Sequence, residues 1–191
     1  DGTEKEEFTS FNIEFTYRKE YKVGNEYYLK STPSPEIEKA RIKSVSMAPF
    51  KVSDKYEVAN LLEDNKGAYE LEFVIKNSGA SKIAFSLHNT KGEKLLMCYD
   101  IMRKQFVMDR SESGKVDFNV NFPAMTVAPV ENTTNICLRL FVDRSSIEAF
   151  GENGEFVMTN RIFPSEPYNK ITFKTERGNY SVKSLKVYKL K

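Results

Sequence analysis

Two copies of the tripeptide Asp-Arg-Ser place an acid, a base and a hydroxyl directly after apolar stretches. They are Asp109-Arg110-Ser111 and Asp143-Arg144-Ser145. A carboxylate beside a guanidinium suits bidentate hydrogen bonding to the vicinal hydroxyls of a sugar, and it equally suits a structural ion pair. Because a lone buried charge is prohibitively costly, charged groups at the ends of core strands must be paired or solvated. The tripeptides therefore predict either a structural charge network or a polar binding site.

Glu148 and Arg161 are predicted to lie on neighbouring strands of a hairpin closed near Asn153-Gly154, where they can approach one another and form an ion pair. Asp143 and Glu148 would face opposite ways on an unbroken strand, and only a turn or bulge would bring them together. A retaining glycosidase needs two carboxyl groups about 5–5.5 Å apart, one with a raised pKa. Since arginines lie close to both carboxylates, we expect both to stay ionised, which argues against a hydrolytic pair.

The other reactive side chains predict no further chemistry. His88 is the one histidine of the sequence and no cysteine cluster accompanies it, so we expect neither a metal site nor a serine–histidine triad. Cys98 and Cys137 both lie in apolar, strand-like stretches, where a free cysteine usually behaves as a small buried hydrophobe. We accordingly expect no metal, no cofactor and no disulfide framework.

Short stretches with alternating apolar residues dominate the chain from Tyr56 onward, and turn residues separate them about every ten residues. The second face of the alternating strands is only partly polar, so another surface can cover it. The pattern predicts an all-β, two-sheet antiparallel β-sandwich of the jelly-roll or lectin-like type. Strands are expected at Tyr69 to Ile75, Ile83 to Leu87, Leu95 to Tyr99, Gln105 to Asp109, Lys115 to Val120, Ile136 to Val142, Ile147 to Phe150, Phe156 to Asn160, Lys170 to Thr175 and Val182 to Leu190.

An N-terminal hairpin and a short helical linker are predicted before the sandwich. Phe11 to Tyr17 alternates like a strand, and Val23 to Glu26 suggests a turn into a second strand at Tyr27 to Leu29. Pro35 to Arg41 has a proline and acids at its start and bases at its end, which suits a short helix.

Composition and charge limit the possible partners. The 191 residues match the usual length of one domain, and 14 Phe and 10 Tyr supply ample material for a core. The formal net charge of +2, with lysines scattered along the chain, argues against a nucleic-acid partner. The longest apolar runs are far shorter than the roughly 20 residues that span a bilayer, so we expect no membrane partner.

Several of these stretches carry a resemblance to a known family. Leu138 to Phe150 reads LRLFVDRSSIEAF and is followed by Arg161-Ile162-Phe163-Pro164, a combination that resembles the C-terminal domain of glycoside hydrolase family 32, which comprises invertases, levanases and inulinases. Phe106 to Ser111 resembles the first Asp-Arg-Ser strand of that domain. Tyr27 to Ile37 resembles the segment that joins the family's catalytic propeller to its sandwich.

The resemblance implies that residues 1–48 are the end of a propeller with its linker and residues 49–191 the C-terminal sandwich. The family's catalytic five-bladed propeller carries Asn-Asp-Pro-Asn, Arg-Asp-Pro and Glu-Cys motifs, and none of the three occurs in this sequence. We expect a non-catalytic accessory domain that packs on the propeller in cis, in an enzyme exported beyond the cytoplasm. An independent module that binds levan or inulin is the alternative, although no tryptophan is present to stack on a sugar. The candidate residues of the sugar site or interface network are Asp109, Arg110, Asp143, Arg144, Glu148 and Arg161.

Overall fold

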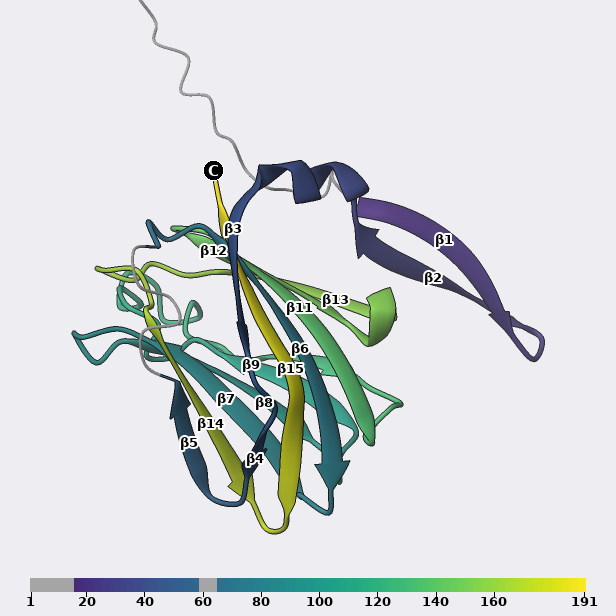
Figure 1. Ribbon diagram of the computed structural model, residues 1–191. Coiled ribbons are helices and arrows are strands. Elements are labelled where there is room, and N and C mark those ends of the chain that lie inside the picture. The colour runs from purple at the N-terminus through teal and green to yellow at the C-terminus, as the bar shows by residue number, and fades with distance from the viewer. Residues whose placement is uncertain (1–15, 59–64) are drawn as a thin grey trace, which may run out of the picture.

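Two antiparallel sheets face each other in the computed structural model, which describes residues 16–58 and 65–191 (Figure 1). The six-stranded sheet has the order β10 (Thr126–Pro129), β9 (Gln105–Asp109), β8 (Lys94–Asp100), β7 (Lys82–His88), β14 (Lys170–Glu176) and β5 (Lys55–Val58). The seven-stranded sheet has the order β13 (Phe156–Arg161), β12 (Ser146–Gly151), β11 (Asn135–Val142), β6 (Tyr69–Ser78), β15 (Asn179–Leu190) and β3 (Arg41–Met47), with β4 (Phe50–Val52) also paired to β15. The predicted all-β sandwich is confirmed.

Alternation along the strands builds the core between the sheets. In β6 the residues Tyr69, Leu71, Phe73 and Ile75 are all buried, because a pleated strand directs every second side chain to the same face. Phe73 packs against Phe85 of the opposite sheet with ring centroids 5.1 Å apart. The two sheets therefore share one apolar interior, as the sequence pattern predicts.

A second, smaller core lies on the outer face of the seven-stranded sheet. Phe141 and Phe150 point outward from β11 and β12, and their rings meet edge to face at 5.8 Å. Ile37 from the short 3-10 helix η2 (Pro35–Ala40) and Leu190 from β15 bury them. This cover explains why the second face of these strands is only partly polar, and η2 occupies the position predicted for the short helix.

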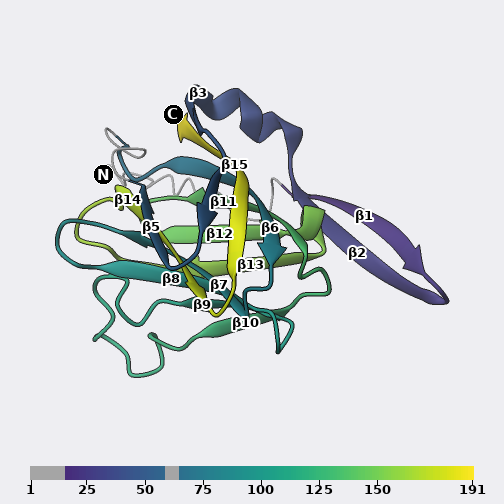
Figure 2. The ribbon, with the colours of Figure 1, turned by 60° about the horizontal axis from the view of Figure 1, so that its bottom comes forward.

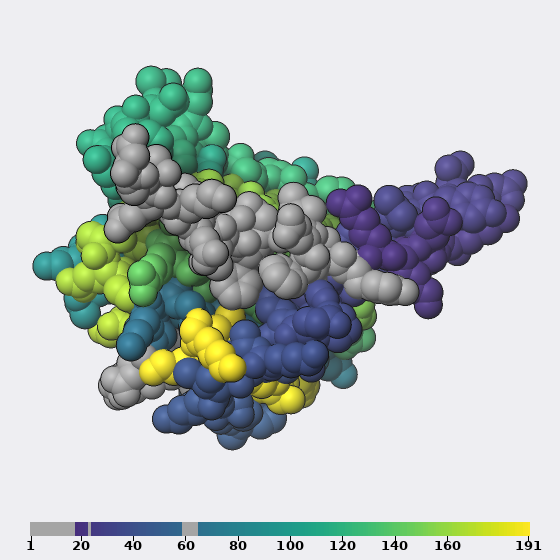
Figure 3. Space-filling model, turned by 90° about the horizontal axis from the view of Figure 1, so that it is seen from above, coloured from purple at the N-terminus to yellow at the C-terminus, as the bar shows by residue number. Residues whose placement is uncertain are grey.

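The strands β1 (Thr16–Val23) and β2 (Glu26–Pro33) form a two-stranded sheet of their own, here called the N-terminal hairpin. It projects away from the sandwich in two different views (Figures 1 and 2) and extends beyond its outline in the space-filling view (Figure 3). Tyr27 and Leu29 are 69% and 57% exposed. The predicted turn at Val23 to Glu26 is confirmed, whereas Phe11 to Phe15 lie outside the described residues.

The structure differs from the sequence prediction in three places. Lys115 to Val120 forms no strand, because Phe118 packs against Phe122 and Phe163 instead. Its ring centroid lies 4.5 Å from that of Phe122 and 5.6 Å from that of Phe163. β3, which the alternation pattern does not predict, pairs with β15 at the edge of the seven-stranded sheet. The short strands β4, β5 and β10 are additional to those predicted.

The described residues contain no helix long and apolar enough to cross a bilayer. Cys98 lies in β8 of one sheet and Cys137 in β11 of the other, and both are free thiols.

Candidate functional site

A buried charge network joins the linker to the seven-stranded sheet. The carboxylate of Glu70 on β6 has no solvent exposure, and it accepts hydrogen bonds from Arg41 Nε at 2.8 Å and from Arg41 Nη2 at 2.7 Å. Arg139 Nε of β11 donates a third hydrogen bond at 2.8 Å. We call Arg41, Glu70, Glu72 and Arg139 the Glu70 network, since Glu72 accepts from Arg41 at 3.0 Å and lies 3.5 Å from Arg139.

The Glu70 network fixes the start of β3 and the end of η2. The Arg41 guanidinium lies 3.8 Å from the ring centroid of Tyr188, whose hydroxyl donates to Glu72 at 3.1 Å. Glu38 of η2 lies 3.6 Å from Arg41 and 3.9 Å from Arg139. Since β3 follows η2 and η2 follows the N-terminal hairpin, this network sets how the hairpin leaves the sandwich.

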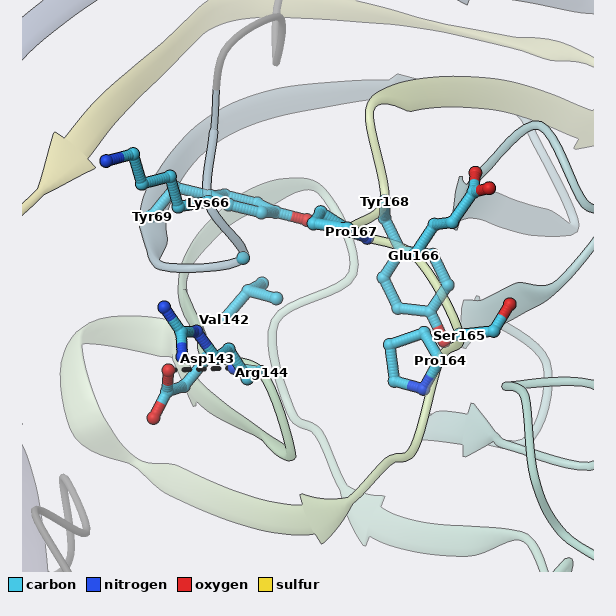
Figure 4. A pocket seen from close by; sticks show the side chains of 11 residues that line it. Lys66, Tyr69, Val142, Asp143, Arg144, Pro164, Ser165, Glu166, Pro167 and Tyr168 are labelled. Atoms are coloured by element: carbon cyan, nitrogen blue, oxygen red, sulfur yellow. Dashed lines mark hydrogen bonds between the residues drawn. The ribbon is translucent and has the colours of Figure 1, made fainter.

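A pocket of about 260 Å³ opens where residues from three distant stretches of the chain meet (Figure 4). Asp143 and Arg144 of the second Asp-Arg-Ser copy lie at its edge, and the Asp143 carboxylate accepts the Arg144 backbone N–H at 2.7 Å. Tyr69 is fully buried, and its hydroxyl has no hydrogen-bond partner. The lining residues are Lys66, Gly67, Tyr69, Val142, Asp143, Arg144, Pro164, Ser165, Glu166, Pro167 and Tyr168.

The first Asp-Arg-Ser copy makes a local turn and a contact to β13. Asp109 accepts the backbone N–H of Ser111 at 2.9 Å. Arg110 donates to the backbone carbonyl of Arg161 at 3.2 Å, and its guanidinium lies 4.3 Å from the ring centroid of Phe122. The structure therefore brings Arg110 and the backbone of Arg161 together and leaves both outside the pocket lined by Asp143 and Arg144.

The expected ion pair between Glu148 and Arg161 does not form. Thr159 lies opposite Glu148 in the hairpin register, and Ser146 lies opposite Arg161. The Arg161 guanidinium lies 5.9 Å from the ring centroid of Phe163 instead. Burial raises the pKa of Glu148 to about 7, so this carboxyl is protonated in part at neutral pH, which differs from the expectation that it stays ionised.

Asp143 and Glu148 do share a recess, because a turn reverses the chain between them. The backbone N–H of Asp143 donates to the carbonyl of Ser146 at 2.9 Å, which supplies the turn that an unbroken strand would lack. The recess holds only about 10 Å³ and is closed by Phe141 and Leu190, among other residues. Such a space holds at most about one water molecule, so no sugar ring enters between the two carboxyls.

A third feature surrounds the short 3-10 helix η3 (Glu152–Gly154), which supports the base of the N-terminal hairpin. Lys30 of β2 pairs with Glu155 at 3.0 Å. Gly154 has φ of +93°, and a Cβ there would lie 2.5 Å from the carbonyl oxygen of Ser31, so only glycine allows this close approach. Burial raises the pKa of Glu152 to about 7.

His88 is the last residue of β7, an inner strand of the six-stranded sheet, and one of its ring nitrogens lies 2.9 Å from the Thr172 hydroxyl of the neighbouring β14. Burial lowers its pKa, which favours the neutral ring. Within residues 16–58 and 65–191 no three metal-ligating side chains gather in one place.

Comparison with known proteins gives consistent matches. The family model "Glycosyl hydrolases family 32 C terminal" matches residues 36–189. The levanase of Bacillus subtilis (strain 168) is 32% identical over 165 residues, which are 84% of this chain and 24% of the levanase. The sucrose-6-phosphate hydrolase of Staphylococcus xylosus is 33% identical over 172 residues, which are 85% of this chain and 32% of that protein.

Solved structures match the fold. The exo-inulinase of Aspergillus awamori superposes with a TM-score of 0.75 at 23% identity, over 92% of this chain and 35% of the inulinase chain. At this identity the likeness shows the sandwich architecture. The chain spans less than a third of the levanase and the hydrolase that it matches.

Proposed function

Since this chain belongs to the C-terminal domains of glycoside hydrolase family 32, we propose that it is the non-catalytic accessory domain of a fructan-hydrolysing glycosidase of the levanase or fructofuranosidase type. In this proposal the chain packs on a catalytic propeller in cis and stabilises it. The relatives named levanase and extracellular exo-inulinase support both the fructan substrate and secretion. The small share of each relative that the chain spans leaves room for a separate catalytic domain.

The N-terminal hairpin is the observation that carries the proposal. An isolated two-stranded hairpin is marginally stable in water, and three or more strands or a packed face are needed for independent stability. Tyr27, Tyr28 and Leu29 nevertheless stay largely exposed on it. We infer that the hairpin completes a sheet of the catalytic domain, and that residues 1–48 comprise the end of the propeller with its linker.

The junction is suited to holding a second domain in a fixed orientation. The Glu70 network holds Arg41, the first residue after η2, by hydrogen bonds. The close approach of the Gly154 backbone to the Ser31 carbonyl holds the second strand of the hairpin near its end. Two separate attachments of one connector restrict its rotation. A domain joined through this connector would keep one position relative to the sandwich.

The geometry of the acids supports a non-catalytic role. The raised pKa of Glu148 would suit a general acid, but the recess that it shares with Asp143 has no room for substrate. We therefore expect the isolated chain to release no fructose from sucrose, levan or inulin.

The test compares the catalytic domain of the encoded protein with and without this chain. We expect the separated catalytic domain to unfold several degrees lower in thermal denaturation and to lose activity faster on warming. Adding the purified chain should restore part of this stability. An equal melting temperature with and without the chain would refute the stabilising role, and fructose release by the chain alone would refute the non-catalytic one.

The alternative is an independent module that holds levan or inulin for another enzyme, and the pocket beside Asp143 and Arg144 favours it. A module of this kind would bind insoluble levan saturably without any catalytic domain, and Arg144→Ala would abolish that binding without unfolding the chain. An accessory domain whose only role is packing would bind no levan at all.

A further inference from the structure

The short turn η3 buries an acid whose carboxyl is not fully paired. Glu152 is 5% exposed, and its Oε1 atom makes no hydrogen bond. Folded proteins pair nearly all buried polar groups, because an unpaired one loses its hydration without compensation. A protonated carboxyl tolerates such a position much better than a carboxylate, since the charged form loses far more hydration energy. The burial of Glu152 therefore depends on its proton.

The groups that face Glu152 supply no positive charge. The backbone of Cys137 on β11 gives the carboxyl one hydrogen bond, and Glu155 adds a second acid nearby. Burial raises the pKa of the Cys137 thiol and of the Tyr99 hydroxyl on β8, and the neighbouring Glu152 raises both further. Lys30 of β2 is the cation at this turn, but Glu155 pairs with it at 3.0 Å. Burial accordingly raises the pKa of Glu152 to about 7.

The backbone of η3 is left-handed at three successive residues. The angle φ is +51° at Glu152, +56° at Asn153 and +93° at Gly154. Asparagine and glycine tolerate this region, whereas a glutamate there is strained, because its Cβ lies too close to the following carbonyl oxygen. Strained residues persist only where the surrounding structure holds them. The contacts of the buried Glu152 side chain therefore help to keep the turn in this shape.

The same turn makes the contact that holds the end of the N-terminal hairpin. The short coil between β12 and β13 lies beside the end of β2 in two different views (Figures 1 and 2). A Cβ on Gly154 would lie 2.5 Å from the Ser31 carbonyl oxygen and 3.0 Å from the Thr32 methyl carbon, so the two segments pack directly on each other. This contact and the ion pair of Glu155 both depend on η3, because Gly154 and Glu155 lie within three residues of Glu152.

We propose that η3 is a proton-controlled latch on the N-terminal hairpin. With Glu152 protonated, the acid stays buried, the left-handed turn persists and Gly154 packs against the end of β2. Loss of the proton leaves a carboxylate that must reach water, so the turn relaxes and withdraws from β2. The Glu70 network still holds the other end of the connector, and the hairpin becomes free to rotate about it.

The sign of the pH dependence follows from the burial. Glu152 binds its proton more tightly in the folded chain than in the unfolded one, where its pKa is 4.5. The contribution of the latch to stability is therefore fully present below about pH 4.5 and is lost as pH rises through about 7. The latch is a property of this chain alone, whereas its effect on the position of a catalytic domain rests on the proposed function.

Nuclear magnetic resonance of the 191-residue chain tests the latch. The readout is the nuclear Overhauser effect between the α protons of Gly154 and the methyl group of Thr32, which are in contact when the latch is closed. Between about pH 5.5 and about pH 8.5 the ionised fraction of Glu152 should rise from about 3% to about 97%. We expect the intensity of the effect to fall at least about fivefold over this range, with its midpoint near pH 7.

Two variants assign the change to one acid. Glu152→Gln should keep the contact at both pH values, because an amide stays neutral. Glu148→Gln is the matched control: burial also raises the pKa of Glu148 to about 7, but this residue lines the recess beside Asp143 and Leu190. This control should lose the contact with rising pH as the unmodified chain does.

Each outcome supports or overturns the latch. In the unmodified chain, a contact that persists at about pH 8.5 overturns it, and so does a midpoint that differs from that of the Glu152 carboxyl carbon shift. An equal loss of the contact in Glu152→Gln, or a contact that becomes independent of pH in Glu148→Gln, overturns it as well. A latch that opens as expected, in an enzyme whose melting temperature is the same with and without this chain, would support the latch and refute the stabilising role of the proposed function.

Discussion

Arg41→Met tests the Glu70 network most sharply. The substitution keeps a long side chain, so packing against Tyr188 is largely retained, but it removes both hydrogen bonds from Arg41 to the Glu70 carboxylate, at 2.8 and 2.7 Å. Glu70 has no solvent exposure, so water cannot replace the lost donors. Arg139 remains as its one strong partner, at 2.8 Å.

The expected cost follows from these contacts. Removing one partner of a buried ion pair destabilises by about 3–5 kcal/mol, because it leaves a buried charge without compensation. Since Arg139 still compensates part of the charge, we expect a value near the lower end, about 3 kcal/mol. For a chain of this length, roughly 2–4 °C per kcal/mol converts this loss into a fall in melting temperature of about 6–12 °C.

Urea denaturation of the 191-residue chain, followed by circular dichroism, gives the free energy of unfolding directly. Lys82→Met is the matched control, because Lys82 pairs with Glu176 at 2.7 Å but both side chains are about half exposed. Exposed pairs contribute about 0–1 kcal/mol, so this variant should unfold almost like the unmodified chain. In a Glu70→Gln background the cost of Arg41→Met should shrink, since a neutral amide needs no cation.

A loss below about 1 kcal/mol for Arg41→Met would refute the reasoning, because it would equal that of an exposed pair. An unchanged cost in the Glu70→Gln background would do the same.

Three further predictions concern pH, backbone and packing. Burial raises the pKa of Glu148 and Glu152 from 4.5 to about 7, so folding favours their protonated forms. The contribution of these two carboxyls to stability should be fully present below about pH 4.5 and be lost as pH rises through 7, so the double Gln variant should lose less of its urea midpoint over this range than the unmodified chain. Gly114→Ala should lower the free energy of unfolding by about 1–3 kcal/mol in the same assay, which is more than Gly92→Ala should. Both glycines have positive φ, but only at Gly114 would an added Cβ clash with the backbone, 2.2 Å from the Phe163 carbonyl oxygen. Phe141→Ala should cost about 3–5 kcal/mol by emptying the small core under η2, and a loss under 1 kcal/mol would show that η2 does not cover it.

The sheets follow from the sequence where one face of a strand is apolar. β6 and β11 alternate clearly, because each buries one face between the sheets. β3 was not predicted because it is an edge strand whose side chains are mostly exposed. Neither of its faces packs in the core, so its sequence shows no apolar alternation. Lys115 to Val120 looked like a strand because Phe118 and Val120 alternate with polar residues, but Phe118 packs in an aromatic cluster of a loop.

The candidate site follows from the sequence only in part. Asp143 and Arg144 do line a pocket, but Tyr69 joins them from β6 and Tyr168 from the loop before β14. The Glu70 network likewise needs the long-range strand order β11, β6, β15 and β3 of the seven-stranded sheet to assemble. The sequence signal for it is the pair of glutamates, Glu70 and Glu72, that alternate with the apolar residues at the start of β6, where a buried charge demands a cation.

Hydrogen exchange of the N-terminal hairpin tests the accessory role most directly. Amides of β1 and β2 should exchange within seconds in the isolated chain, because a lone hairpin opens readily, while those of β6 and β11 stay protected. In the full-length enzyme the same hairpin amides should be protected as strongly as the sandwich strands. Equal, rapid exchange of the hairpin in both forms would contradict the claim that it completes the catalytic domain.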